Sequence, residues 1–337
     1  MSKILVTGAS GHLGFHLVQL LLKENHEVCC FVRKTSFIEH LKKLPVEICY
    51  GDLFDKDSLH KALGGVTKIF HTGAVFNLSP TDNNNIVKTA VMGVENLFSV
   101  IKENYPLQIE RIVYTSSVET IGVSNNKDKP LNEENYVEDF KHPYCEAKNR
   151  AEKLALKLAE ENNVELVICN PSTIIGENDF RITPSNQMIL SLASNVFPIY
   201  VDSGQNLVHV EDVAMGHILA MKRGKPSERY ILCGENISMK NLIKKIKAIT
   251  GGITPFIPIP QICLKSIGLL CELEGKLLNK PLRFSRQRAE NMVGKYTYYQ
   301  YNKSAQELGY NPKPLDSFLK ETLQWLLSQE KKLLFSY

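Results

Sequence analysis

The sequence predicts an α/β fold, a doubly wound parallel sheet followed by a smaller α+β part, and three observations support this prediction. Short apolar segments alternate with amphipathic segments from the start of the chain, as expected for parallel strands covered by helices. The first apolar segment runs directly into a glycine-rich turn and then an amphipathic segment. Small and polar residues follow several apolar segments, at the strand ends where such sheets bind ligands.

The first strand is expected at residues 4–6, and the turn after it reads Thr7-Gly8-Ala9-Ser10-Gly11-His12-Leu13-Gly14. Gly8 permits a tight turn, Gly11 leaves room for a pyrophosphate, and Gly14 lets the new helix pack closely on the strand. The free N–H groups and positive dipole end of that helix attract phosphate. Glycines also end strands for purely structural reasons, but the position of the motif after a buried strand predicts a nucleotide site. Its expected lining is Thr7, Gly8, Ser10, Gly11, His12, Leu13 and Gly14.

A second strand, expected at residues 27–32, ends in Arg33, which bears on the choice of cofactor. An acidic residue at this position would bind the ribose hydroxyls of NAD, whereas an arginine pairs with the 2′-phosphate of NADP. No acidic residue follows the strand before Glu39, so we expect NADP rather than NAD. The alternative is that Arg33 is only a solvated loop charge.

A third strand, expected at residues 46–50, is followed by Asp52 and Leu53 as candidate cofactor ligands. Asp52 is placed to accept a hydrogen bond from an adenine amino group, although an aspartate at a strand end often only caps the next helix, here expected at 55–63. The helix expected at 86–103 carries Asn96, which we interpret as a polar anchor.

A fourth strand, expected at residues 68–71, ends in His71, which we expect to be packed in the strand end and not catalytic. Small residues follow it and would let the backbone approach the cofactor: Thr72, Gly73 and Ala74.

The candidate catalytic residues follow the fifth strand, expected at 109–114. That strand ends in Thr115-Ser116-Ser117, and after a polar surface loop at 124–143 a helix opens with Tyr144-Cys145-Glu146-Ala147-Lys148. Tyr144 and Lys148 are four residues apart and share one helix face. The ordinary pKa of tyrosine is about 10, and we expect the Lys148 ammonium to lower it and to hold the nicotinamide ribose. With Ser117 as donor to the substrate oxygen, the three residues predict a proton-transfer site beside a hydride carrier.

The chain divides near residue 172 in this interpretation. Residues 1–172 bind the nucleotide, with segments at about 205–235 returning to that domain, and residues 173–337 mainly bind substrate. A sixth strand is expected at 164–169, a long irregular segment before residue 207, and later elements at 229–233, 242–250, 262–278 and 314–328. Pro171 and Thr173, just beyond the sixth strand, are expected to line the cofactor site. The apolar residues of 257–270 fit either a greasy pocket or lid, or plain core.

Composition excludes several classes of protein. Hydrophobic residues make up 43%, charged residues 23%, and the net charge of +4 comes without a basic block, so nucleic acid is not an expected partner. We expect no signal peptide and no membrane span, because no segment approaches about 20 uninterrupted apolar residues. The eight cysteines show no metal-ligand spacing, and those in strand-like segments (Cys29, Cys30, Cys49 and Cys169) are expected to be reduced, buried thiols of a cytoplasmic protein without a metal site.

The motifs TGASGHLG, YTSS and YCEAK, in this order, resemble the extended short-chain dehydrogenase/reductase superfamily, also called the NAD-dependent epimerase/dehydratase family. Within it the chain is similar to the dihydroflavonol-4-reductase-like and 3β-hydroxysteroid-dehydrogenase-like branch. Its greatest similarity is to bacterial hopanoid-associated sugar-epimerase-like proteins, through NPSTIIGENDFRITPS, NLVHVEDVAMGHILAM, RYILCGENIS and SAQELGYNPKPL. The resemblance spans residues 4 to about 326.

This resemblance implies a Rossmann-type domain, a small C-terminal substrate domain and often a homodimer. It implies that Tyr144 is the acid/base, Lys148 its partner and ribose ligand, and Ser117 the substrate-oxygen donor. For the cofactor it implies pyrophosphate at Gly8, Gly11 and Gly14, adenine at Asp52 and the 2′-phosphate at Arg33.

Three functions are compatible with these residues. The first is an NADP(H)-dependent oxidoreductase that reduces a ketone or aldehyde, or oxidises a secondary alcohol, on a small and mostly apolar substrate. The second is a nucleotide-sugar epimerase or dehydratase with retained NAD(P); against it, Asn170 stands where many sugar-nucleotide enzymes carry an arginine, and no basic cluster for a diphosphate is evident. The third is a non-catalytic NADP-binding regulator, against which the intact Ser-Tyr-Lys set argues.

Overall fold

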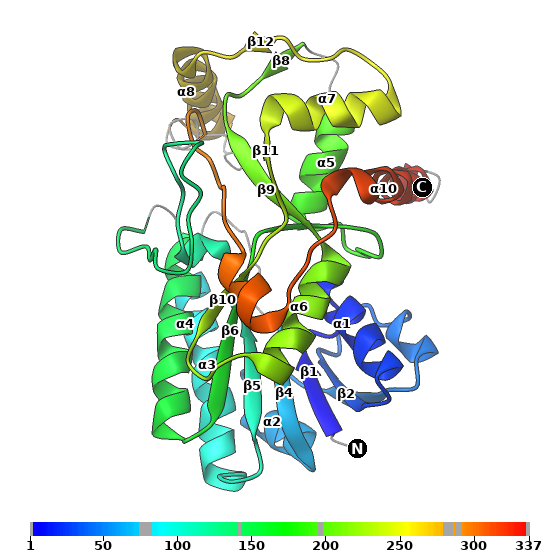
Figure 1. Cartoon of the computed structure of the whole chain (residues 1–337), viewed down its shortest axis with the longest axis vertical. Helices are drawn as coiled ribbons and strands as arrows, with labels where there is room; N and C mark the ends of the chain where they lie inside the picture. The colour runs from blue at the N-terminus through cyan, green and yellow to red at the C-terminus, as the bar shows by residue number, and fades with distance from the viewer. Residues whose placement is uncertain are drawn as a thin grey trace.

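The computed structural model describes residues 3–73, 83–140, 143–194, 198–278, 286 and 292–334. Its largest element is a seven-stranded sheet with the order β10-β6-β5-β4-β1-β2-β3, in which every pair of neighbours is parallel. The expected doubly wound α/β fold is therefore confirmed (Figure 1). The strands are β1 Lys3–Thr7, β2 Glu27–Val32, β3 Glu47–Tyr50, β4 Val66–His71, β5 Arg111–Thr115, β6 Glu165–Pro171 and β10 Arg229–Leu232.

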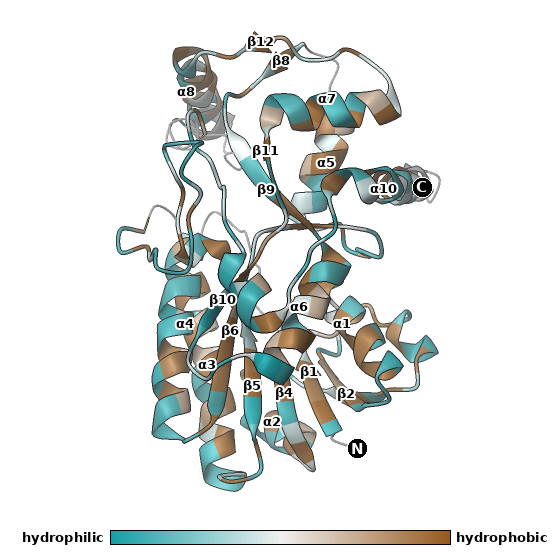
Figure 2. Ribbon diagram, in the orientation of Figure 1, coloured by the Kyte–Doolittle hydropathy of each residue, from teal (hydrophilic) through white to brown (hydrophobic). Residues whose placement is uncertain are grey.

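Alternate residues of each strand are buried on opposite faces of this sheet. On β1, Ile4 and Val6 pack with α1 (His12–Lys23) and α6 (Val210–Arg223), whereas Leu5 packs on the other face. That other face is covered by α2 Lys56–Leu63, α3 Asn83–Asn104 and α4 Pro143–Glu161. Burial on both faces explains why the strands are continuous apolar segments, shown in brown at the centre of Figure 2.

A smaller part lies beyond the carboxyl ends of the large sheet, at the top of Figure 1. Its sheet has the order β11-β9-β7, and its core joins apolar side chains such as Leu190, Leu207, Leu242 and Leu323. The elements are β7 Thr173–Ile175, α5 Pro184–Ser194, β8 Ile199–Tyr200, β9 Gly204–His209, β11 Glu235–Ser238, α7 Met239–Thr250, β12 Ile257–Pro258, α8 Gln261–Leu278 and α10 Leu319–Leu334. Short helical turns lie at Leu41–Lys43, Val118–Thr120, Ser304–Leu308 and Leu315–Ser317.

The helix α5 corrects the expectation of an irregular segment before residue 207. Pro184 supplies the first turn, where a missing N–H is harmless. Beyond it Ile189 and Leu190 are buried with residues of α7 and α10. The short helix is thus stabilised by packing against segments far along the chain, which the local sequence does not reveal.

Most apolar residues of 257–270 are exposed, so plain core is not the explanation for this stretch; a pocket or lid role stays a prediction. Ile262 and Leu270 on α8 are 70% and 66% exposed, and among the apolar side chains of 261–274 only Leu264 is buried. Within the described ranges, no helix is both long and apolar enough to cross a membrane.

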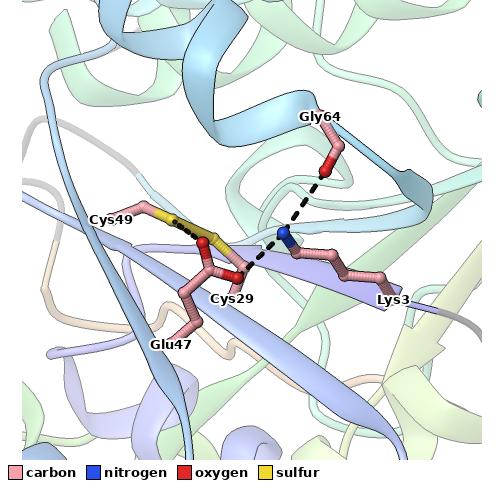
Figure 3. Close-up of a disulfide and its surroundings, with 5 residues drawn as sticks. All are labelled: Lys3, Cys29, Glu47, Cys49 and Gly64. Atoms are coloured by element: carbon pink, nitrogen blue, oxygen red, sulfur yellow. Dashed lines mark hydrogen bonds and ion pairs between the residues drawn. A yellow bond between two sulfur atoms is a disulfide. The ribbon is translucent and has the colours of Figure 1, made fainter.

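Two of the expected free thiols are instead joined. Cys29 on β2 and Cys49 on β3 form a disulfide, with 6.4 Å between their Cα atoms (Figure 3). The register of these strands places Cys29 opposite Glu47 and Cys49 opposite Phe31, so the two side chains are diagonal neighbours on one face. Cys30 and Cys169 are buried thiols, as expected.

Candidate functional site

A cavity of about 860 Å³ opens over the carboxyl ends of the large sheet and is bounded on its far side by residues 181–185. The structure brings together in its wall the predicted site residues that it describes: Thr7, Gly8, Ser10, Gly11, His12, Leu13, Gly14, Arg33, Asp52, Leu53, Thr72, Gly73, Ser117, Tyr144, Lys148, Pro171 and Thr173. Ala74 lies outside the described residues. Strand ends far apart in the sequence converge here because all the strands run in the same direction.

The glycine turn is packed too tightly for side chains at two positions. Gly8 has φ +71°, and a Cβ there would lie 2.8 Å from Gly73 Cα. A Cβ at Gly14 would lie 2.3 Å from the carbonyl oxygen of Gly8. These contacts support the expected roles of Gly8 in the turn and Gly14 in helix packing. At Gly11 the closest atom is 3.2 Å away, so the constraint is weaker.

The N-terminus of α1 points its amide groups toward the cavity without a side-chain cap. Gly11 is the N-cap residue, it makes no side-chain cap hydrogen bond, and the first turn carries no acidic residue. Four orphan N–H groups are expected at a helix start. Uncapped amides and the positive end of a helix dipole are the features expected of a phosphate site, which this turn stays predicted to be.

His12 lies in this turn but brings no charge to it. Burial lowers the pKa of His12, so the ring is neutral near pH 7. Its Nε2 donates to the carbonyl oxygen of Glu177 at 2.9 Å, and Nε2 of His16 donates to the same oxygen at 3.1 Å. The phosphate binding predicted for this turn would therefore depend on backbone amides and not on an imidazolium.

The end of β4 is fixed by hydrogen bonds to the end of β1. Thr7 Oγ1 lies 3.1 Å from His71 Nδ1 and accepts from the amide of Gly73 at 3.1 Å, while Thr72 Oγ1 donates to the carbonyl of Thr7 at 2.7 Å. Burial and the nearby Lys148 lower the pKa of His71 to about 4. His71 is packed in the strand end, as expected.

Two cations and a hydroxyl gather at the end of the cavity near β2 and β3. Arg33 and Ser36 follow β2, and Arg181 is brought toward them by Phe180, which stacks on His40; all three line the cavity, and neither arginine forms an ion pair with a carboxylate of the described residues. One carboxylate oxygen of Asp52 accepts from the amide of Phe54 at 3.1 Å. Asp52 does not cap the helix, because Asp55 is the N-cap of α2. The segment next to Asp52 is anchored as expected, since Asn96 Nδ2 donates to the carbonyl of Leu53 at 2.9 Å.

Ser117, Tyr144 and Lys148 meet at the inner end of the cavity. Ser117 caps the short helix Val118–Thr120, where its Oγ accepts from the amide of Glu119 at 3.2 Å. A side-chain hydrogen bond also links Ser117 with Tyr144. Lys148 is 8% exposed, and its Nζ donates to the carbonyl of Thr115 at 3.1 Å.

The expectation that Lys148 lowers the pKa of Tyr144 is not met. Burial raises the pKa of Tyr144 and the charge of Glu119 adds to this, while the hydrogen bond to Ser117 acts against them. Lys148 is absent from these causes, and burial instead lowers the pKa of Lys148 itself to about 8. Tyr144 is therefore protonated at neutral pH.

Sequence reasoning missed the far wall of the cavity, the segment that contains Arg181 and Ser185. Asp179 organises this segment by accepting from Thr183 N at 2.6 Å and Asn186 Nδ2 at 2.9 Å. Ile182 is held at φ 45°, a left-handed conformation that is rare for a β-branched residue and is concentrated at functional sites. The Asp-to-Thr spacing of four residues was the only local signal.

The cavity, with its phosphate turn and serine-tyrosine-lysine cluster on a parallel sheet, defines a dinucleotide-dependent enzyme of the short-chain type. The chain belongs to the NAD dependent epimerase/dehydratase family, whose model matches residues 4–233. The expected superfamily is thus confirmed, and with it an NAD(P)-dependent oxidoreductase acting on CH–OH or C=O groups.

Several relatives extend over nearly the whole chain. A Synechocystis sp. protein named "Putative dihydroflavonol 4-reductase" is 34% identical over 95% of this chain and 93% of its own length. Cinnamoyl-CoA reductase 2 of Medicago truncatula is 29% identical, over 92% of this chain and 93% of its own. The crystal structure of gox2253 matches with a TM-score of 0.84 at 35% identity, covering 98% of this chain and 99% of that one.

Proposed function

We propose that the protein is an NADP(H)-dependent reductase of a ketone or aldehyde on a small, mostly apolar substrate. The observation that carries this proposal is the meeting of Ser117, Tyr144 and Lys148 at the inner end of the cofactor cavity. Relatives named as reductases support it. NADPH, when bound, would supply the hydride that reduces the carbonyl carbon.

Tyr144 acts as the acid. Burial raises its pKa, so the phenol is protonated at neutral pH and has a proton to give to the carbonyl oxygen as the hydride arrives at carbon. The Ser117 hydroxyl, linked to Tyr144 by a side-chain hydrogen bond, holds the same oxygen in line. Lys148 lines the same cavity, and we assign its ammonium to a ribose hydroxyl of the cofactor.

The substrate end of the cavity favours an apolar molecule. Val118, Ile174, Ile182 and Pro184 line it with Ser172 and Ser185. We assign this end to substrate and, in general, residues 173–337 to the substrate domain, with 1–172 and about 205–235 holding the nucleotide. The homodimer and the cytoplasmic location stay predictions.

The preference for NADP is proposed from the two guanidinium groups at the adenosine end. Arg33, Ser36 and Arg181 line the same cavity, and a 2′-phosphate would supply the anion that both arginines lack among the described residues.

A nucleotide-sugar epimerase or dehydratase is the alternative, favoured by the family description itself. It is opposed by Asn170, which is 0% exposed and donates to the carbonyl of Ser117, so it offers nothing to a diphosphate in the cavity.

The test is turnover of NADPH and of NADH by the purified protein with a panel of ketones and aldehydes. Tyr144→Phe is the active-site variant, and Tyr50→Phe, a half-exposed tyrosine outside the cavity wall, is the matched control. Carbonyl-dependent NADPH oxidation that is lost only in Tyr144→Phe is the expected result. Tight cofactor binding with no net oxidation, together with conversion of a sugar nucleotide, would overturn the proposal in favour of the alternative.

A further inference from the structure

A buried carboxylate lies directly behind the proposed catalytic residues. Glu152 follows Lys148 by four residues on α4, as Lys148 follows Tyr144, so the three side chains share one helix face. Glu152 is 0% exposed, in a part of the protein where an uncompensated charge is very unfavourable. Its partners therefore need to be identified.

Each oxygen of Glu152 has a distinct set of partners. Oε1 forms an ion pair with Arg229 Nε at 2.8 Å. Oε2 accepts from the Ser116 hydroxyl, from Thr120 Oγ1 at 3.0 Å and from Asn170 Nδ2 at 3.0 Å. These donors come from three segments of the chain, so the carboxylate holds together the stretch after β5, the end of β6 and the start of β10.

Two of these donors also contact the backbone of Ser117. Thr120 Oγ1 lies 2.9 Å from the carbonyl oxygen of Ser117, and Asn170 Nδ2 donates to the same oxygen at 3.1 Å. The Ser116 hydroxyl, one residue earlier, donates directly to Glu152. The position of the Ser117 side chain in the cavity is thus set by groups that Glu152 orients.

Arg229 completes the arrangement from the edge strand β10. Its Nη2 donates to Thr120 Oγ1 at 2.8 Å, and its Nη1 donates to the carbonyls of Glu133 and Asn135, both at 3.1 Å. The guanidinium also lies over the Tyr136 ring, 4.4 Å from its centroid. Nε makes the ion pair with Glu152 without hydrogen-bond geometry, and the contacts of Nη1, Nη2 and the ring face hold the positive charge beside the carboxylate.

We propose that Glu152, paired with Arg229, is a positioning residue that holds Ser117 in place and keeps the Lys148 ammonium charged. A buried ion pair contributes little to stability relative to an apolar pair of the same shape, so its presence here favours a role in the site. The proposal rests on the proposed function for its effect on turnover, but its effect on Lys148 stands independently.

Electrostatics gives the size of the expected effect. Burial lowers the pKa of Lys148 to about 8, and the charge of Glu152 acts in the opposite direction. A unit charge one helical turn away shifts a pKa by about two units at an effective dielectric constant of about 20, and Arg229 cancels part of this. The loss of the Glu152 charge alone should therefore lower the Lys148 pKa by about two pH units, because the Arg229 charge stays, whereas the loss of both charges should lower it by about one. The other titratable or charged groups around this cluster are His71, Tyr114, Glu119, Tyr136 and Tyr144.

The direct test titrates Lys148 by NMR, through the ¹³Cε shifts of labelled lysine in the full chain, with the signal assigned by its loss in Lys148→Arg. Glu152→Gln should move the titration midpoint down by about two pH units. Glu165→Gln is the matched control, because it breaks an exposed Glu–Arg pair with Arg111 on the same sheet. An unchanged midpoint in Glu152→Gln would overturn the proposal.

Turnover supplies the second measurement. The rate of carbonyl-dependent NADPH oxidation should fall as pH rises through the Lys148 pKa, and this alkaline limb should move to lower pH in Glu152→Gln, with Glu152→Asp restoring most of the shift. If Glu152→Gln does not fold, the double variant Glu152→Gln/Arg229→Gln leaves no unpaired buried charge and takes its place, with an expected midpoint shift of about one pH unit downward. Full turnover in Tyr144→Phe with a shifted Lys148 midpoint would refute the proposed function and support the coupling. Loss of turnover in Tyr144→Phe, together with an unchanged Lys148 titration midpoint and an unchanged alkaline limb of the pH profile in Glu152→Gln, would refute the coupling alone.

Discussion

Gly14→Ala adds one methyl group where α1 crosses the glycine turn. The new Cβ would lie 2.3 Å from the carbonyl oxygen of Gly8 and 2.9 Å from Ala9 Cα, whereas Cβ contacts under 3.0 Å are essentially never seen, so α1 must move by at least about 0.7 Å. Overpacking of this kind costs about 1–3 kcal/mol, and the better helix propensity of alanine returns up to about 1 kcal/mol. We expect a net loss of about 1–2 kcal/mol and an NADPH dissociation constant raised at least tenfold, because the phosphate-binding amides move with the helix.

Urea unfolding and NADPH fluorescence titration measure the two effects. Gly93→Ala is the matched control: it also lies inside a helix, α3, but its Cβ would meet Leu53 Cδ1 at an ordinary 3.5 Å. That variant should be as stable as the unmodified protein or more stable, by up to about 1 kcal/mol. If Gly14→Ala bound NADPH and unfolded like Gly93→Ala, the explanation of the turn by close packing would be wrong.

Three further predictions concern charge and covalent structure. Arg33→Ala and Arg181→Ala should each weaken NADPH binding roughly 10- to 100-fold in a fluorescence titration and leave NADH binding nearly unchanged, since a hydrogen bond to a charged group contributes about 1.5–3 kcal/mol; equal losses for both nucleotides would exclude a 2′-phosphate contact. Burial lowers the pKa of His16 to about 4 in the folded protein, whereas an unfolded histidine titrates near about 6.5. As the pH falls, the unfolded chain therefore binds a proton at His16 before the folded protein does, and the free energy of unfolding should decrease between about pH 6.5 and pH 4. Urea unfolding of the unmodified protein and of His16→Gln measures this effect. At pH 4 the unmodified protein should have lost about 2–3 kcal/mol more of its free energy of unfolding than the variant, and the same pH dependence in both would contradict the prediction. Dithiothreitol should lower the unfolding temperature, because reduction opens the 20-residue loop between Cys29 and Cys49. Closing a loop of this length contributes about 3 kcal/mol to stability. The unfolding temperature of the Cys29→Ser/Cys49→Ser variant should not change with dithiothreitol.

The sequence alone was sufficient to predict the strands of the large sheet and the residues that lie around their carboxyl ends. Strands buried on both faces are continuous apolar segments, so each expected strand of residues 4–169 lies within two residues of the observed one. The parallel order then brings the turn after β1 together with Ser117 and Tyr144 without further information.

The features that the sequence did not predict depend on contacts between distant segments of the chain. Arg181 enters the cavity wall only because Asp179 folds its segment back, and Cys29 meets Cys49 only through the register of β2 and β3. The pKa of Tyr144 is set by burial, a property of the packed protein that helix spacing does not report. Nothing in the local sequence distinguishes Glu152 from other residues of its helix, because its partners come from elsewhere in the chain.

The two histidine rings that share one carbonyl oxygen limit how this protein can be re-engineered. Grafting another substrate loop between β7 and α5 replaces Glu177, and unless the donor loop presents a carbonyl at the same place, His12 and His16 each lose a hydrogen-bond acceptor in a buried environment. Each such loss costs about 1–3 kcal/mol. Chimaeras designed to change the substrate must therefore exchange the phosphate-side helix positions 12 and 16 together with the loop.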